Sequence, residues 1–175
     1  MIVRWLALFV VLLAGTANAQ PVGVEIVQYG LYRSDVVDKQ RDVAGVTHNV
    51  IDNICHLATT EVVPMKIGVH FGVRYKVTGP VAGQRVLLKK VLRYPTVMAS
   101  PTRSASSMVV NFVELPVGTT SYTEYALEQP WELASGAWTF QFFERDRMLA
   151  EFRFTVAEDA TVAESNEPIC FQLSS

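Results

Sequence analysis

The three histidines, His48, His56 and His70, are the residues of this chain best suited to bind a metal ion or to move a proton. Imidazole is a good ligand for zinc and copper. Their spacing matches no ligand motif such as H-E-x-x-H. We therefore expect hydrogen-bonded or surface histidines, with no metal and no other cofactor. His48 and Asn49, inside the apolar run of residues 46–50, form the polar cluster most in need of hydrogen-bond partners.

Nucleophilic catalysis has no recognisable signature in the chain. The sequence contains no G-x-S-x-G motif, no glycine-rich phosphate loop and no C-x-x-C pair. We therefore expect no catalytic residues and a protein that is not an enzyme. A hydrolytic or metal-handling protein with an unrecognised site remains the alternative.

The two cysteines, Cys55 and Cys170, are expected to form one disulfide bond. The first 19 residues support this, because they have the pattern of a secretory signal peptide. Arg4 precedes an apolar stretch, and small residues end the segment at Ala19. We expect cleavage after Ala19 and a periplasmic or secreted protein, where disulfide bonds persist. Two free buried thiols are the alternative.

The composition indicates one domain and argues against a nucleic-acid partner. The chain has 15 Lys+Arg against 17 Asp+Glu, and losing Arg4 with the signal leaves 14 against 17, a net charge of −3. A nucleic-acid-binding domain usually has a basic face. After residues 1–19 no apolar segment is long enough to span a membrane. We expect a domain over residues 20–157 and an acidic tail over residues 158–175, tied back by Cys170.

The segments that must position these residues have the pattern of short strands. Residues 67–79 alternate strictly between apolar and polar or small side chains, which predicts a strand with one buried face. Further strands are expected over 22–32, 45–51, 85–94, 107–115 and 120–127, together with two closing segments. Loops are expected over 34–42 and 96–107, and at most a short helical turn between Asp52 and Thr60. The pattern predicts an all-β fold, a single antiparallel β-sandwich of immunoglobulin-like architecture. A β-barrel is the alternative.

The closing segments, residues 137–143 and 148–156, place their apolar side chains on even positions. If they form a hairpin, both apolar rows reach one face only when an odd number of residues separates opposed positions. We therefore expect a three-residue loop, Glu144-Arg145-Asp146, with Asp146 in the left-handed region. Trp138, with Phe152 or Phe154, should be among the most buried residues.

A few side chains are not explained by the expected core, and they are our candidates for an interaction surface. Phe143 falls on the outward face of the hairpin and is expected near Leu149. The segment 85–94 gathers basic residues, with Lys89, Lys90 and Arg93 among them. These basic residues suit an anionic partner. Lysines that protect the edge strand of a sheet from aggregation explain them equally well.

The motifs FGVRYKVTGP, RYP, PWELASGAWTF and RMLAEFRFTV occur in this order, and with them the chain resembles the bacterial family called domain of unknown function 3859. The resemblance covers about residues 24–156. It implies an exported or envelope-associated β-sandwich without an established activity, and it transfers no catalytic residues. The family usually has glycine in the last hairpin turn, where this chain has Glu144 to Arg147.

Taken together, the residues predict an exported β-sandwich that acts as a non-enzymatic binding or interaction module. Its partner would be a protein or another ligand of the cell envelope. The sequence does not identify that partner.

Overall fold

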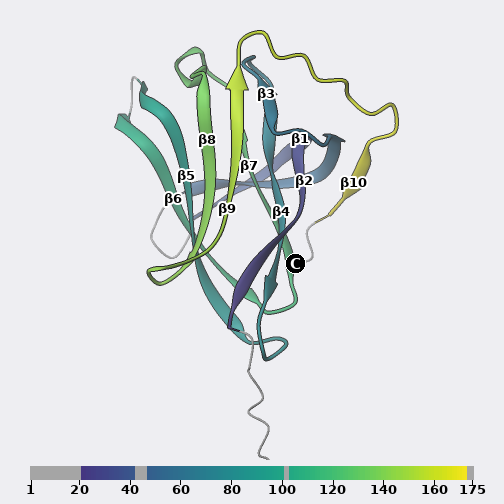
Figure 1. Ribbon diagram of the computed structural model, residues 1–175, viewed down its shortest axis with the longest axis vertical. Coiled ribbons are helices and arrows are strands. Elements are labelled where there is room, and N and C mark those ends of the chain that lie inside the picture. The colour runs from purple at the N-terminus through teal and green to yellow at the C-terminus, as the bar shows by residue number, and fades with distance from the viewer. Residues whose placement is uncertain (1–20, 42–46, 101–102, 173–175) are drawn as a thin grey trace, which may run out of the picture.

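The computed structural model describes residues 21–41, 47–100 and 103–172, and the side chains of 21–39, 53–95 and 106–172. The expected signal peptide therefore lies outside the described residues. Ten strands and one short 3-10 helix follow one another in the described part of the chain (Figure 1). Their bounds are β1 Gly23–Arg41, β2 Thr47–Ala58, β3 Val62–Pro64, β4 His70–Thr78, β5 Arg85–Ser100, β6 Arg103–Pro116, β7 Thr120–Ala126, η1 Pro130–Glu132, β8 Gly136–Glu144, β9 Arg147–Ala157 and β10 Ile169–Phe171.

The strands form two sheets, which makes the fold a β-sandwich. Sheet A has the order β10-β2-β1-β4-β7, and sheet B has the order β3-β9-β8-β5-β6. All pairings are antiparallel except that of β3 with β9. The prediction of an all-β, antiparallel, immunoglobulin-like sandwich is confirmed. β5 lies inside sheet B, between β8 and β6, so the interpretation of its lysines as protection for an edge strand is wrong.

The core lies between the two sheets and is mainly aromatic and β-branched. Period-two alternation places Phe71, Val73, Tyr75 and Val77 of β4 on the inner face, and all four are fully buried. The ring of Phe71 meets those of Trp138 and Phe154 edge-on, at centroid distances of 5.5 and 5.3 Å. Such edge-to-face contacts add to the stabilisation from burying the rings.

The β8–β9 hairpin keeps the expected pairing of aromatic rows but reaches it differently. Trp138 opposes Phe154 and Phe140 opposes Phe152, as the parity argument requires. The loop, however, has two residues, and Arg145 rather than Asp146 has a positive φ, of 54°. A register shift occurs beyond Phe142, where Leu149 is the extra residue of a bulge. Leu149 therefore makes the number of residues between opposed aromatic positions odd, which we had expected the loop to do.

The same bulge reverses which side chains of β9 face the core near the turn. Leu149 is half-buried and packs against the core, whereas Met148 is 51% exposed. Met148 belongs to the even-numbered row, which was expected to be buried. The expectation fails there because one extra residue moves the following side chain to the other face.

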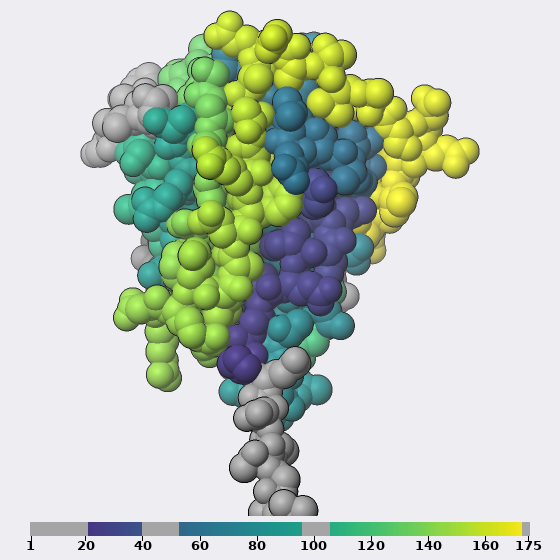
Figure 2. All heavy atoms as spheres, in the orientation of Figure 1, coloured from purple at the N-terminus to yellow at the C-terminus, as the bar shows by residue number. Residues whose placement is uncertain are grey.

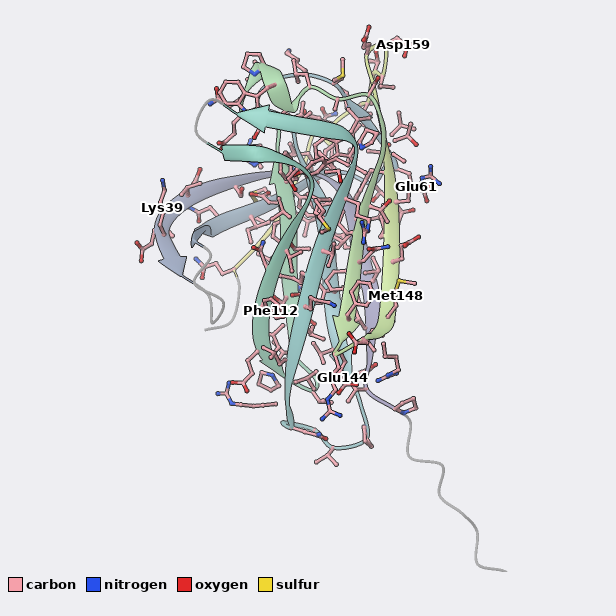
Figure 3. All side chains as sticks on the ribbon, turned by 90° about the vertical axis from the view of Figure 1, so that its left-hand side faces the viewer. Lys39, Glu61, Phe112, Glu144, Met148 and Asp159 are labelled. Atoms are coloured by element: carbon pink, nitrogen blue, oxygen red, sulfur yellow. A yellow bond between two sulfur atoms is a disulfide. The ribbon has the colours of Figure 1, made fainter. Side chains whose placement is uncertain are left out.

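Two segments expected to be loops are strands instead. β1 continues through 34–41, and β5 and β6 extend to Ser100 and from Arg103. The region from Asp52 to Thr60 belongs largely to β2 and contains no helical turn. Within the described residues, the distal parts of β1 and β2 pair only with each other, with several register shifts, and form a ribbon. Figure 3 shows this ribbon leaving the body of the sandwich, with Lys39 on the part that extends from it.

Candidate functional site

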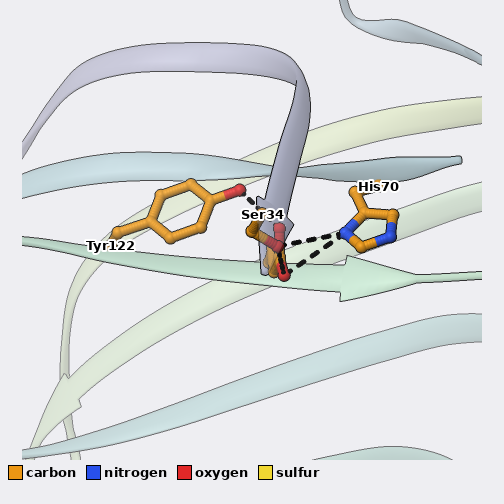
Figure 4. A network of polar contacts seen from close by, with 4 residues as sticks. Ser34, His70 and Tyr122 are labelled. Atoms are coloured by element: carbon orange, nitrogen blue, oxygen red, sulfur yellow. Dashed lines mark hydrogen bonds and ion pairs between the residues drawn. The ribbon is translucent and has the colours of Figure 1, made fainter. Parts of the chain in front are cut away.

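A cluster of polar side chains lies on the outer face of sheet A, where the β1–β2 ribbon crosses β4 and β7. Ser34 comes from β1, His70 from the start of β4, and Tyr122 and Glu124 from β7 (Figure 4). We call these four residues the Glu124 cluster. The outer row of β4 has glycine at position 72, opposite Glu124. A Cβ atom there would overlap the carbonyl oxygen of Thr123, so only glycine lets the two strands approach this closely.

The carboxylate of Glu124 is the acceptor on which the cluster is built. Ser34 Oγ donates to its Oε1 at 2.6 Å, and Tyr122 Oη donates to its Oε2 at 2.8 Å. His70 Nδ1 lies 3.4 Å from Oε1 and 3.2 Å from Ser34 Oγ. The Ser34 hydroxyl donates its single proton to the carboxylate, so it can only accept a hydrogen bond from His70. His70 Nδ1 is therefore protonated and is the donor toward Ser34 and Glu124.

The surroundings of the cluster shift the pKa values of two of its members. The hydrogen bond to Glu124 raises the pKa of His70, and burial opposes this rise only partly. The pKa of Tyr122 is raised well above its usual value because the ring is buried and Glu124 is close. At neutral pH Tyr122 is therefore a hydrogen-bond donor, and His70 tends toward its charged form.

Serine, histidine and glutamate together suggest a hydrolase, but their arrangement differs from a nucleophilic triad. In a triad the serine donates to the imidazole, and the acid binds the other ring nitrogen. Here Ser34 donates directly to Glu124, and both residues contact the same nitrogen of His70. The Glu124 carboxylate thus accepts the Ser34 proton, which the imidazole would accept in a triad. The hydrogen bonds of the cluster connect β1, β4 and β7.

An aromatic cluster continues from the Glu124 cluster across the outer face of sheet A. Tyr32, Ile54 and Tyr122 are buried, and Phe171 of β10 packs against them. Tyr32 and Tyr122 meet at 4.7 Å between ring centroids, and the guanidinium carbon of Arg74 lies 4.4 Å from the centroid of the Phe171 ring. Burial raises the pKa of Tyr32. The outer face of sheet A therefore has a small core of its own.

The predicted disulfide holds β10 in this position. Cys55 and Cys170 are bonded, and they oppose each other directly in the β2–β10 pair, with Cα atoms 3.9 Å apart. Cys55 is buried, whereas Cys170 is exposed. The bond joins positions separated by 115 residues. The bond thereby fixes β10 to the β2 edge of sheet A.

The outer face of sheet B contains a second candidate surface, a row of side chains across four strands. In register, Phe112 of β6 opposes Lys89 of β5, Lys89 opposes Phe143 of β8, and Phe143 opposes Met148 of β9. The Lys89 ammonium lies 4.8 Å from the centroid of the Phe143 ring. Phe112 and Met148 mark the two ends of the row (Figure 3). We call these four residues the sheet B platform.

A row of polar side chains lies next to the platform on the outer face of sheet B. Arg93 Nε donates to Gln141 Oε1 at 3.0 Å, and Gln141 Nε2 donates to Glu151 Oε2 at 2.7 Å. These bonds connect β5, β8 and β9 on the outer face. Arg93 therefore lies on the outer face of sheet B, next to the platform, and its role in an interaction surface stays a prediction.

Two other surface candidates, Lys90 and Leu149, do not belong to the platform. Lys90 shares the inward face of β5 with Leu88 and Leu92, and it lines a cavity of about 60 Å³ between the sheets with Asn111 and Thr123. Leu149 packs against the core as the bulge residue. Phe143 is half-buried under Lys89, so it does not form the exposed pair with Leu149 that the sequence suggested.

The two histidines whose side chains are described, His56 and His70, bind different groups. His56 is buried, and its Nε2 lies 3.0 Å from the carbonyl oxygen of Tyr29, which makes it a structural hydrogen-bonding residue. His70 belongs to the Glu124 cluster. The side chains of His48 and Asn49 lie outside the described residues. Among the described side chains, no group of three or more His, Cys, Asp or Glu is placed to hold a metal ion.

Sequence reasoning missed Ser34 and Glu124, the centre of the site on sheet A. Ser34 lay in a segment interpreted as a loop. Tyr122 and Glu124 are two residues apart in the predicted strand 120–127, and this spacing could have placed both side chains on the same face. The described residues contain no helix with the length and apolar character that a membrane crossing requires.

Comparison with solved structures supports the fold. An immunoglobulin-like protein from Pseudomonas aeruginosa is 26% identical, with a TM-score of 0.54, and the match covers 81% of this chain and 99% of that protein. A β-glucosidase from Erythrobacter marinus matches with 13% identity and a TM-score of 0.31, over 67% of this chain and 18% of the enzyme. A β-glucosidase from Kluyveromyces marxianus matches with 12% identity and a TM-score of 0.28, over 73% of this chain and 16% of the enzyme.

A search of curated proteins finds no match to this chain. The comparison with family models does find one. The model described as Domain of unknown function (DUF3859) matches residues 21–156, which include all strands from β1 to β8 and nearly all of β9. The expected resemblance is thus confirmed, and the chain belongs to the DUF3859 family.

Proposed function

We propose that this protein is an exported, non-enzymatic binding module that contacts its partner through the sheet B platform. The carrying observation is the platform itself. Lys89, Phe112 and Phe143 are half-buried, and Met148 is exposed, in one row across four paired strands. A rigid sheet therefore presents aromatic and flexible apolar surface together with a cation.

The side chains of the platform suit binding more than catalysis. Aromatic residues and methionine are enriched in protein interfaces, whereas lysine is depleted there unless its charge is used. Here the Lys89 ammonium is partly compensated by the Phe143 ring, a contact that contributes about 0.5–1 kcal/mol at exposed sites. A partner with an acidic group beside an apolar patch would satisfy both features. The Arg93–Gln141–Glu151 row supplies polar contacts at the rim.

Export is supported by the signal-like N-terminus and by the disulfide bond, since such bonds persist mainly in oxidising compartments. Intact-mass measurement of the protein from a periplasmic fraction tests this part. The mass should correspond to a chain that begins at Gln20. A mass that still contains residues 1–19 would contradict export with cleavage.

The platform is tested by photo-crosslinking in the native envelope. A photoreactive phenylalanine analogue replaces Phe143 in one variant and Trp131 in a matched control, because Trp131 is an exposed aromatic residue on η1. We expect a discrete crosslinked species from position 143 that is absent from position 131. Lys89→Glu should reduce its yield, whereas Lys76→Glu, on the outer face of sheet A, should leave it unchanged. Identical patterns from both positions would contradict the proposed surface.

A further inference from the structure

The C-terminal strand β10 is attached to the sandwich by only a short pairing. It pairs with β2 over three positions, from Ile169–His56 to Phe171–Ile54. Between β9 and β10, residues 158–168 form no strand (Figure 1). Figure 2 shows this C-terminal segment at the margin of the molecule. Ile169 is 64% exposed, so Phe171 is the main side chain by which β10 contacts the sheet.

Phe171 occupies a defined site on the outer face of sheet A, which we call the Phe171 site. Its ring lies edge-on to Tyr122 and Tyr32, with centroids 5.9 and 6.5 Å apart, and under the guanidinium of Arg74. Ile54 is the fourth residue of the site. Two aromatic walls and a cation above the ring select an aromatic side chain over an aliphatic one.

Next to the Phe171 site lie backbone and side-chain polar groups that β10 does not bind. β2 runs from Thr47 to Ala58, and on the side of β10 only residues 54–56 have a strand partner among the described residues. The carbonyl oxygen of Leu57 accepts from Ser165 N, so the free part of the edge precedes residue 54. The hydroxyl of Tyr32 is buried, and no described group forms a hydrogen bond with it. A buried hydroxyl without a partner is costly, and a bound polar atom would remove that cost. An edge strand and an unused donor therefore adjoin a filled aromatic site.

We propose that the β2 edge and the Phe171 site form a docking site for an extended partner segment that carries an aromatic residue. In the disulfide-bonded chain β10 occupies this site as an intramolecular substitute. The binding mode is strand addition, in which the backbone pairs with a sheet edge and a side-chain pocket gives specificity. The class of partner follows from the residue that already fits.

The disulfide bond between Cys55 and Cys170 explains why a strand of three residues stays bound at the Phe171 site. A tethered segment acts at an effective concentration in the millimolar range when its linker is short and flexible. A partner at lower concentration is then excluded until a dithiol reductant cleaves the bond to two thiols and is itself oxidised to a disulfide. Cys170 is the exposed half of the bond. The surface lies on sheet A, so it is independent of the sheet B platform.

The test uses the full-length chain with β10 detached. The variant Cys55→Ser/Cys170→Ser/Phe171→Ala leaves the tail without its bond and without its ring. The probe is a fluorescent synthetic peptide of residues 166–172 with Cys170→Ser, and binding is read by fluorescence anisotropy. We expect saturable binding, and about tenfold weaker binding of the same peptide with Phe171→Ala, the size expected from losing ring and cation contacts. The oxidised wild-type protein should also bind the probe about tenfold or more weakly.

Two results would overturn the proposal. One is equal affinity for the two peptides, and the other is no saturable binding to a variant that retains a cooperative thermal transition. If the triple variant does not fold, Cys55→Ser/Cys170→Ser with Phe171 retained replaces it, because the bond that holds β10 on the β2 edge is still removed. Adding Arg74→Gln to the variant that is used should weaken peptide binding about threefold, in line with a lost cation–π contact. Unchanged binding there would remove Arg74 from the site.

Discussion

The protein packs aromatic residues in two places, between its sheets and on the outer face of sheet A, and the two places differ in kind. Between the sheets Phe71, Trp138 and Phe154 are fully buried. On the outer face Tyr32 and Tyr122 are equally well covered, but by the β1–β2 ribbon and by the disulfide-bonded β10. The first cluster is made by strands that form the sandwich. The second is made where the β1–β2 ribbon and β10 pack on the outer face of sheet A.

This difference implies that the two clusters have different roles. Removing a side chain from the inter-sheet core leaves a cavity that neither sheet can fill. The outer cluster contains polar groups, among them Glu124 with its three neighbours, and one of its walls is a three-residue strand. We therefore expect the inter-sheet core to determine global stability and the outer cluster to open locally.

The largest effect is expected from the inter-sheet core. Phe154→Ala should lower the free energy of unfolding by about 3–5 kcal/mol, because it empties a fully buried site. The matched control is Phe143→Ala on the outer face, where the half-buried ring also loses its contact with Lys89, for a cost of about 1 kcal/mol. Denaturant unfolding compares the two. Equal losses would mean that the faces of the hairpin are misassigned.

The next effect concerns the bond that closes the outer cluster. Cys170→Ser should cost about 2–4 kcal/mol of stability, since the crosslink joins positions 115 residues apart and restricts the unfolded chain. Phe171→Ala with the bond intact should cost less. Chemical denaturation without reductant measures both. A larger loss for Phe171→Ala would show that the ring, and not the crosslink, dominates the attachment of β10.

A smaller effect is expected within the Glu124 cluster. Tyr122→Phe removes the hydroxyl that donates to Glu124 Oε2 and keeps the packed ring. Hydrogen bonds to charged groups contribute about 1.5–3 kcal/mol. Ser34 still donates a hydrogen bond to the carboxylate, so we expect a loss of unfolding free energy near the low end of this range. Thermal and denaturant unfolding check this. No measurable loss would place the carboxylate in contact with solvent.

The smallest expected effect is a pH dependence from His70, whose pKa is raised in the folded protein by its hydrogen bond to Glu124. A raised folded pKa means that the folded state binds the proton more tightly than the unfolded chain does. The contribution is complete below the unfolded pKa of about 6.5 and is lost as the pH rises through the folded value. Stability of wild type should fall over this window more than that of His70→Gln. Parallel pH profiles would contradict the assignment.

The sequence predicted the inter-sheet core better than the outer cluster, for a physical reason. Period-two alternation in 67–79 and parity in the closing hairpin encode a buried face locally, and Phe71, Trp138 and Phe154 were placed correctly. The bulge at Leu149 was missed, because nothing in the hydrophobic pattern distinguishes a loop residue from an extra strand residue. His70 and Glu124 are diagonal neighbours on the paired strands β4 and β7, but Ser34 joins them only because the β1–β2 ribbon crosses the sheet, and no local pattern encodes a crossing.

Hydrogen exchange followed by mass spectrometry, with and without a thiol reductant, tests the central claim that the outer cluster is a separate and releasable unit. Exchange reports local opening segment by segment. On reduction we expect amides of β10 and of residues 54–56 in β2 to lose protection by about tenfold or more. Protection in β4, β8 and β9 should stay unchanged. A uniform loss across both sheets would contradict the account, because the disulfide would then support the sandwich itself.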